Sequence, residues 1–145
     1  MTLYINMEKN FLTEREANNY SPLSLAFLGD SVYDTLVREY LLRQANMPVA
    51  KLHSAKIKLV CAEFQSASYD MLAEKLDEHE LAVLKRGRNA TGNTVPKHAD
   101  AAQYRRATAV ECLFGYLFLT GQQERICELF ELIINQTEDN SVIIK

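Results

Sequence analysis

Apolar residues recur at helical spacing along most of the chain. The clearest run follows Ser21, which suits a helix N-cap, and Pro22, which suits the first helical position. Within the 24 residues from Ser21 to Gln44, the apolar positions fall on one helical face. The same spacing predicts helices at 12–18, from Val49 to about 69, from Asp77 to about 86, from Asp100 to 119 and at 122–135, with a short helical turn around 71–76.

Local signals place several of these boundaries. Asn46-Met47-Pro48 ends the first long helix, because proline disfavours helical conformation in the residue before it. Asp77 and Glu80 have the spacing of a capping box, and Gly121 follows the helix that ends near 119. No segment alternates like a strand. We therefore predict an all-α fold in a single domain spanning 1–145, with 1–19 and 137–145 less ordered than the rest.

Two of the predicted helices carry carboxylates inside apolar runs, each beside a glycine. Gly29 is followed by Asp30, with Asp34 one turn later, and Glu111 precedes Gly115 by one turn. Glycine weakens a helix interior, so the presence of Gly29 suggests that another backbone or a ligand comes close there. If the two helices cross near their glycines, Asp30 and Glu111 converge on one site. Two half-buried carboxylates need a cation or a shared proton, and oxygen ligands favour magnesium or manganese over zinc.

Amino-acid composition limits the class of protein and the cellular location that we expect. Hydrophobic residues make up 48% of the chain, enough for a core of its own, and no apolar run is long enough to cross a bilayer. No secretory leader is recognisable, so we expect a cytoplasmic protein with no membrane partner. Cys61, Cys112 and Cys127 lie in apolar helical contexts and are expected to be buried, reduced thiols. His79 has no partner at ligand spacing and is expected at the surface.

Charge is distributed unevenly. The segment 85–106 has a net charge of +5, whereas the rest of the chain has −8. Within it, 87–97 is rich in Gly, Asn, Thr and Pro and is predicted to be a loop whose amides and hydroxyls can bond phosphate and sugar. The predicted RNA-contacting residues are Lys85, Arg86, Arg88, Asn89, Thr91, Lys97, Arg105 and Arg106. The lysines between Lys51 and Lys58 suit a solvated face as well as they suit RNA.

The two acidic motifs resemble those of a known family. Leu-Ala-Phe-Leu-Gly-Asp-Ser-Val, residues 25–32, resembles the ribonuclease III motif Leu-Glu-Phe-Leu-Gly-Asp-Ala-Val. Val-Glu-Cys-Leu-Phe-Gly-Tyr-Leu-Phe-Leu, residues 110–119, resembles its second helix, Phe-Glu-Ala-Leu-Ile-Gly-Ala-Ile-Tyr-Leu. The chain leaves no room for a following double-stranded-RNA-binding domain, as in the Mini-ribonuclease III branch. The matching loop of that branch, Gly-Arg-Asn with a downstream Pro-Lys, is thought to contact RNA.

The resemblance implies the ribonuclease III endonuclease-domain fold, a helical bundle, and magnesium-dependent hydrolysis of double-stranded RNA, with Mn²⁺ as a substitute metal. Asp30 and Glu111 would be the catalytic metal ligands, and Asp34 a candidate to hold a metal-bound water. Ala26 and Thr108 replace two further carboxylates of full-length ribonuclease III, which implies more water around the metal. The implied substrate is the base-paired stem of precursor 23S ribosomal RNA, with a ribosomal protein on the precursor large subunit as a further candidate partner.

A homodimer is also implied, with two active sites that each cut one strand. Phe27, Leu28, Tyr33, Val37 and Tyr40 widen the apolar face of their helix beyond what one core needs, which is typical of a subunit interface.

Three other readings stay open. The two acids could cap helices or pair with Arg105 or Arg106 as structural groups. The chain could be a catalytically inactive double-stranded-RNA-binding or ribosome-associated protein on the same scaffold. A helical nucleotide pyrophosphohydrolase is the third, although such enzymes usually carry a Glu-x-x-Glu pair that we do not find here.

Overall fold

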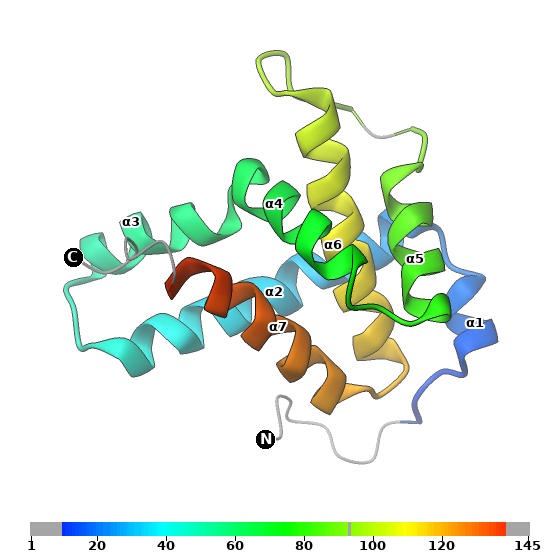
Figure 1. Ribbon diagram of the computed structural model, residues 1–145, viewed down its shortest axis with the longest axis horizontal. Helices are drawn as coiled ribbons and strands as arrows, with labels where there is room; N and C mark the ends of the chain where they lie inside the picture. Colours follow the sequence, from blue (N-terminus) through cyan, green and yellow to red (C-terminus); the bar gives the residue numbers. More distant parts are fainter. Residues whose placement is uncertain (1–9, 93, 139–145) are drawn as a thin grey trace.

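The computed structural model describes residues 10–92 and 94–138, and within them every regular element is a helix (Figure 1). This confirms the all-α prediction. The helices are α1 (Glu14–Asn18), α2 (Pro22–Gln44), α3 (Val49–Val60), α4 (Ala62–Ala73), α5 (Glu78–Arg88), α6 (Ala101–Leu119) and α7 (Gln123–Glu138). The predicted order of 1–9 and 139–145 lies outside the described residues.

Helices α2 and α6 form the centre of the molecule, and they cross with their backbones in contact. A Cβ atom added to Gly29 would overlap the backbone carbonyl of Glu111, and one added to Gly115 would overlap the carbonyl of Leu25. Only glycine allows this approach, because any side chain would force the helices apart. The predicted crossing near the two glycines is therefore confirmed, and it brings the Asp30 turn of α2 against the Glu111 turn of α6.

The other helices cover this pair. In Figure 1, α4 and α5 lie against α6, while α3 and α7 flank the second half of α2. The aromatic core lies beneath them, where the ring of Tyr33 packs edge-on against Phe114 and Phe130 with centroids 5.6 and 5.9 Å apart. The Tyr33 hydroxyl donates a 2.6 Å hydrogen bond to the carbonyl of Leu59 in α3. The core thus joins α2, α3, α6 and α7.

This packing corrects the predicted breadth of the apolar face of α2. Tyr33 and Val37 are fully buried within the chain's own core, and Tyr40 is half-buried against the ring of Phe130. Phe27 is different, because 84% of its surface is exposed. The face available to a partner on this helix is therefore narrower than the sequence pattern indicated and is centred on Phe27.

The predicted caps are confirmed, but one predicted helix is wrong. Ser21, Asp77 and Asp100 accept hydrogen bonds from the first turns of α2, α5 and α6, and Gly121 has a φ of 75° after α6. The expected single helix from Val49 to about 69 is instead two helices. It breaks at Cys61, whose extended ψ of 155° ends α3 and starts α4. Helix α4 then continues through the predicted separate turn as far as Ala73.

Burial of the cysteines also differs from the prediction. All three are free thiols, but only Cys112 is buried, while Cys61 and Cys127 are half-buried. His79 is exposed, as expected, and the described residues contain no cluster of three or more His, Cys, Asp and Glu that could hold a metal by themselves.

A buried ion pair fastens α7 to the start of α5. Glu80 is 3% exposed, and its carboxylate accepts hydrogen bonds of 2.8 and 2.9 Å from Arg125. Arg125 also donates to the carbonyl of Lys75 and to Glu128. Its hydrogen bonds to Glu80 first, and then to Glu128, raise the pKa of its guanidinium above the ordinary value. Because these partners satisfy the fork of Arg125, the buried charge is well compensated.

Candidate active site

Asp30 and Glu111 line the same cavity, which has a volume of about 470 Å³ and lies between α2, α4 and α6. Asp30 is exposed at the cavity, while Glu111 is half-buried. Their positions follow from the glycine crossing, since Asp30 directly follows Gly29, and the backbone of Glu111 is the group that Gly29 contacts. The structure thus brings together the two acids that the sequence proposed as a pair.

The two carboxylates of Asp30 and Glu111 lie close together with no positive charge from the described residues to balance them, and burial together with this closeness shifts the pKa of Glu111. Burial, and after it the hydrogen bond and negative charge of Asp30, together raise the pKa of Glu111 from 4.5 to about 9. At neutral pH without a cation, Glu111 therefore holds a proton that it shares with Asp30. Neither acid takes part in the ion pairs of the described residues, so the structural alternative of pairing with Arg105 or Arg106 has no support there.

The donor set fits a hard divalent cation. Both groups are carboxylates that open to one cavity, and a cation between them would replace the proton on Glu111 and remove their mutual repulsion. Among the described residues no third acid, histidine or cysteine joins them. Water and substrate oxygens would complete the shell, which suits magnesium because it keeps several waters when bound to proteins.

Asp34 is engaged elsewhere. Its carboxylate lies 2.7 Å from Nε of Arg38 and 3.5 Å from Nζ of Lys56, and it is not among the residues that line the cavity. The ion pairs with Arg38 and Lys56 provide a structural explanation for Asp34 that does not involve the Asp30–Glu111 pair.

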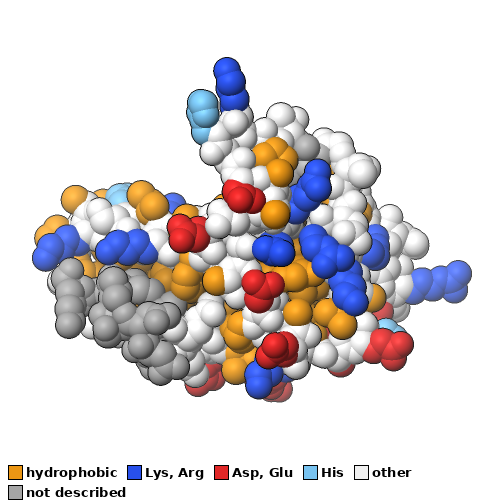
Figure 2. All heavy atoms as spheres, turned by 45° about the horizontal axis from the view of Figure 1, so that its top comes forward, with side chains coloured by type: hydrophobic (Ala, Val, Ile, Leu, Met, Phe, Trp, Pro, Cys, Tyr) orange, Lys and Arg blue, Asp and Glu red, His pale blue; other side chains and the backbone are white. Residues whose placement is uncertain are grey.

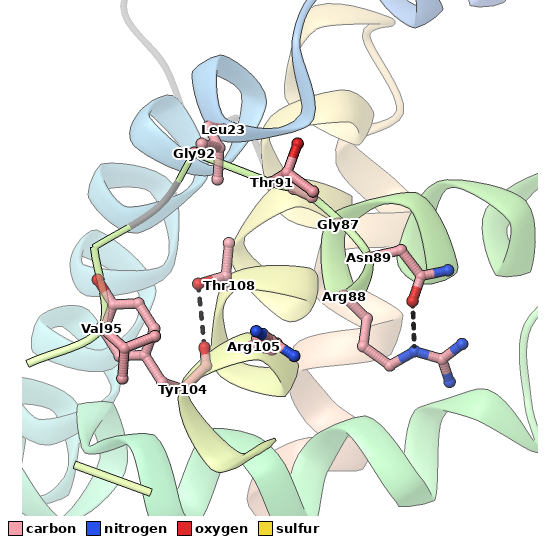
Figure 3. A pocket seen from close by; sticks show the side chains of 11 residues that line it. Leu23, Gly87, Arg88, Asn89, Thr91, Gly92, Val95, Tyr104, Arg105 and Thr108 are labelled. Carbon is pink, nitrogen blue, oxygen red and sulfur yellow. Dashed lines mark hydrogen bonds between the residues drawn. The ribbon is translucent and has the colours of Figure 1, made fainter. Parts of the chain in front are cut away.

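A second cavity, of about 360 Å³, adjoins the first. The two share Leu23, Tyr104 and Thr108 as wall residues. Figure 3 shows Arg105 next to the hydrogen-bonded Tyr104 and Thr108, and Arg88 farther along the wall with its guanidinium turned toward Asn89. The loop after α5 runs along the top of this view. Of the predicted RNA-contacting residues, this cavity brings together Arg88, Asn89, Thr91 and Arg105.

Arg88 is held in place by neighbouring side chains. Its Nη1 donates a 2.9 Å hydrogen bond to the hydroxyl of Tyr69, its Nε donates to Oδ1 of Asn89 at 3.1 Å, and the guanidinium lies 5.9 Å from the centroid of the Tyr69 ring. These contacts use only part of the guanidinium fork and fix its position at the cavity wall.

The remaining predicted RNA contacts do not line this cavity. Lys85 and Lys97 are exposed, and Arg106 is half-buried on the first half of α6. Arg86 donates 2.8 and 3.2 Å hydrogen bonds to Oδ1 and the carbonyl of Asn18, and a third to the carbonyl of Tyr20. This arginine therefore ties α5 to the turn between α1 and α2. Basic side chains nevertheless gather on the right half of the face in Figure 2, over α5 and α6.

Sequence reasoning missed two polar residues of the acidic cavity, Gln65 and Tyr104 in its wall. Gln65 follows Ala62 by three positions on the face expected to be apolar, so a polar residue at a buried helical position was the available signal. Tyr104 lies two turns before Glu111 on the same helical stripe, and this spacing is the signal that the sequence offers for it.

Comparisons with known proteins agree on one family for this chain. Residues 23–122 match the Ribonuclease III domain family. A protein named Mini-ribonuclease 3 from Brevibacillus brevis is 44% identical over 125 residues, covering 86% of this chain and 92% of that protein. Another from Thermoanaerobacter is 40% identical over 128 residues, covering 88% and 90%.

A solved structure agrees with these relatives. The crystal structure of a protein from Fusobacterium nucleatum superimposes with a TM-score of 0.76 at 31% identity, over 85% of this chain and 94% of that one. The family match spans both glycine-containing helices and the cavity between them. The chain therefore belongs to the Ribonuclease III domain family and is an endoribonuclease.

Proposed function

We propose that this protein hydrolyses phosphodiester bonds of double-stranded RNA in a magnesium-dependent reaction at the cavity of Asp30 and Glu111. The observation that carries the proposal is the pairing of these two acids in one cavity, directly beside a second cavity lined by Arg88 and Arg105. The arrangement offers a place for a divalent cation next to a place for phosphate.

The residues of the acidic cavity can each be assigned a role in this reaction. Asp30 and Glu111 would hold the cation, which when bound makes an attacking water more acidic and neutralises charge at the phosphorus. Glu111 first has to lose the proton that its raised pKa retains, and Asp30, already exposed to the cavity, offers the first ligand oxygen. The Gly29–Gly115 backbone contact keeps the two carboxylates from moving apart.

The neighbouring cavity suits the RNA backbone. Arginine forks bind phosphate oxygens, and the exposed Asn89 and Thr91 can bond phosphate or the ribose 2′-hydroxyl, which is how a duplex is recognised largely by shape. We assign the first contacts to Arg88 and Arg105, since both line the cavity that adjoins the carboxylates. Lys85, Lys97 and Arg106 would act by their charge over a longer range.

We further propose that the active form is a homodimer, with Phe27 at the interface. Phe27 is 84% exposed, and it lines the acidic cavity, so a partner covering it would lie at the edge of the site. Two such sites would each cut one strand. The base-paired stem of precursor 23S ribosomal RNA is the proposed substrate, with a ribosomal protein on the precursor large subunit as a candidate helper.

An inactive double-stranded-RNA-binding protein is the second candidate function. A protein that only binds RNA gains nothing from two acids that face the same cavity as its phosphate contacts, since they repel the ligand. The raised pKa of Glu111 shows that the pair is also unfavourable for folding at neutral pH. Both features favour the nuclease over the binder.

Cleavage assays with matched acidic variants test the proposal. The wild-type protein is incubated with duplex and with single-stranded RNA, with magnesium or with EDTA, beside Asp30→Asn, Glu111→Gln and the control Asp34→Asn. We expect magnesium-dependent cleavage of the duplex by the wild type and by Asp34→Asn, because Asp34 is engaged by Arg38 and Lys56. The Asp30 and Glu111 variants should bind the duplex and not cut it. Normal cutting by either one refutes the assignment.

A further inference from the structure

Helix α4 begins at the wall of the acidic cavity without a side-chain cap. Its N-cap residue is Cys61, whose side chain makes no capping hydrogen bond, and the first bond to the N-cap carbonyl comes from the backbone N–H of Gln65. The backbone N–H groups of Ala62 and Glu63 precede that point, so the helix does not use them internally. Val60 and Ala62 line the cavity, so this end of the helix opens toward Asp30 and Glu111.

Gln65 lies in the same first turn and is buried without a partner. It is 3% exposed, yet no hydrogen bond joins its side-chain amide to any described residue. The glutamines at 122 and 136, by contrast, donate to Thr120 and to Ser68. Gln65 lines the cavity, and its amide is not among the sealed, unpartnered side-chain atoms, which comprise only the Tyr116 hydroxyl in the described chain. The amide therefore faces the cavity.

An amide that opens to the cavity and has no partner among the described residues is available to bind a ligand there. The donors at this wall are the amide of Gln65 and the free N–H groups at the positive end of a twelve-residue helix. All of them are uncharged N–H groups, and together they suit an anion with several oxygens. The opposing groups are Asp30 and Glu111 across the cavity and the exposed Glu63 on the same turn.

We propose that Gln65 and the first turn of α4 bind a non-bridging oxygen of the phosphodiester that is to be cut. This inference rests on the proposed function and extends it by assigning the phosphate a place opposite the carboxylates. A cation held by Asp30 and Glu111 would then contact the phosphate from one side, and the neutral donors of α4 from the other. Uncharged donors can hold the phosphate oxygen without competing for the carboxylates as a lysine would.

Phosphate binding can be tested without any catalytic step. In ¹⁵N-labelled protein at pH 7 without metal, inorganic phosphate should shift the backbone amides of Ala62 and Glu63 and the side-chain NH₂ of Gln65. Sodium chloride at matched ionic strength should not. The shifts should be lost in Gln65→Met, which keeps the side-chain volume and removes the amide. If phosphate and chloride act alike at these amides, the inference is overturned whether or not the protein cuts RNA.

Single-turnover cleavage of duplex RNA provides the second test. Gln65→Met should lose about 100-fold in rate, the usual effect of removing one preorganised donor, and Gln65→Glu should lose more because it adds a negative charge. The thermal midpoint of Gln65→Met should not fall, since no hydrogen bond of the described chain is removed. The matched control Gln136→Met breaks the 3.0 Å bond to Ser68 of the same helix, away from the cavity, and should show the reverse pattern.

The outcomes separate the two proposals. Normal cleavage by Gln65→Met, or a rate loss that tracks a lowered thermal midpoint, overturns the role of Gln65. Absence of duplex cleavage by the wild type overturns the proposed function, while the phosphate titration still decides the anion site. Shifts at α4 with wild-type cleavage and a stable, slow Gln65→Met variant would support both.

Discussion

The proton on Glu111 links the pH dependence of folding to cation binding. Burial, with Asp30 beside it, raises the pKa of this side chain from 4.5 to about 9. The folded state therefore binds one proton more than the unfolded state between these two values. The contribution of Glu111 to stability is fully present below pH 4.5 and decreases as the pH rises toward 9.

The size of this effect follows from the two pKa values. At pH 7, which is about 2.5 pH units above the ordinary value, the loss relative to acid conditions is about 3 kcal/mol, at roughly 1.4 kcal/mol per unit. Glu111→Gln carries no titrating group and should not show this loss. In EDTA, its free energy of unfolding should consequently exceed that of the wild type by an amount that grows from pH 5 to pH 8.

Urea denaturation across that pH range, in EDTA and in excess magnesium, measures the effect. Magnesium should stabilise the wild type and release a proton from Glu111, so its benefit should increase with pH, and calorimetry in buffers of different ionisation enthalpy would count that proton. Glu111→Gln should gain little from magnesium. Equal pH slopes for the wild type and the variant in EDTA would refute the shared-proton account of the site.

Four further predictions concern packing and the basic surface. Gly115→Ala should destabilise the fold by at least about 2 kcal/mol, measured by urea denaturation, because its Cβ would overlap an α2 carbonyl. Arg125→Ala should lower stability by about 3–5 kcal/mol, because it leaves Glu80 buried and unpaired, and Arg125→Lys should recover only part of this. Arg105→Ala should weaken duplex RNA binding, flatten its salt dependence by about one counterion and leave the melting temperature nearly unchanged. Arg86→Ala should instead lower the melting temperature, since it removes three hydrogen bonds to the α1–α2 turn; an unchanged melting temperature would contradict this role.

The sequence predicted the elements whose signals are local. The cap at Ser21, the capping box of Asp77 and Glu80, and the glycines at 29 and 115 each carry their own physical reason, and the structure uses all of them. The pairing of Asp30 with Glu111 followed from the same glycines. These inferences held because each depends on a few neighbouring residues and one helix crossing.

Features that depend on the whole fold could not be predicted from the sequence as well. The break at Cys61 has no proline or glycine to mark it, and the apolar spacing continues through it, so only tertiary packing decides where the chain turns. Tyr33 and Val37 looked like surplus apolar surface because the sequence does not reveal how many helices cover α2. In the sequence, Arg86 looks like an ordinary surface cation. In the structure its guanidinium donates a hydrogen bond to the backbone carbonyl of Asn18, which is far away in the chain.

The crossing of α2 and α6 has a consequence for how this enzyme can change. Asp30 and Glu111, the proposed metal ligands, sit on the turns of α2 and α6 that touch at the two glycines, so folding of the chain also sets the spacing of the two acids. Substitutions at Gly29 or Gly115 would therefore disturb folding and the spacing of the two acids together, whereas the loop after α5 and the first turn of α4 lie outside this backbone contact and can change without disturbing it.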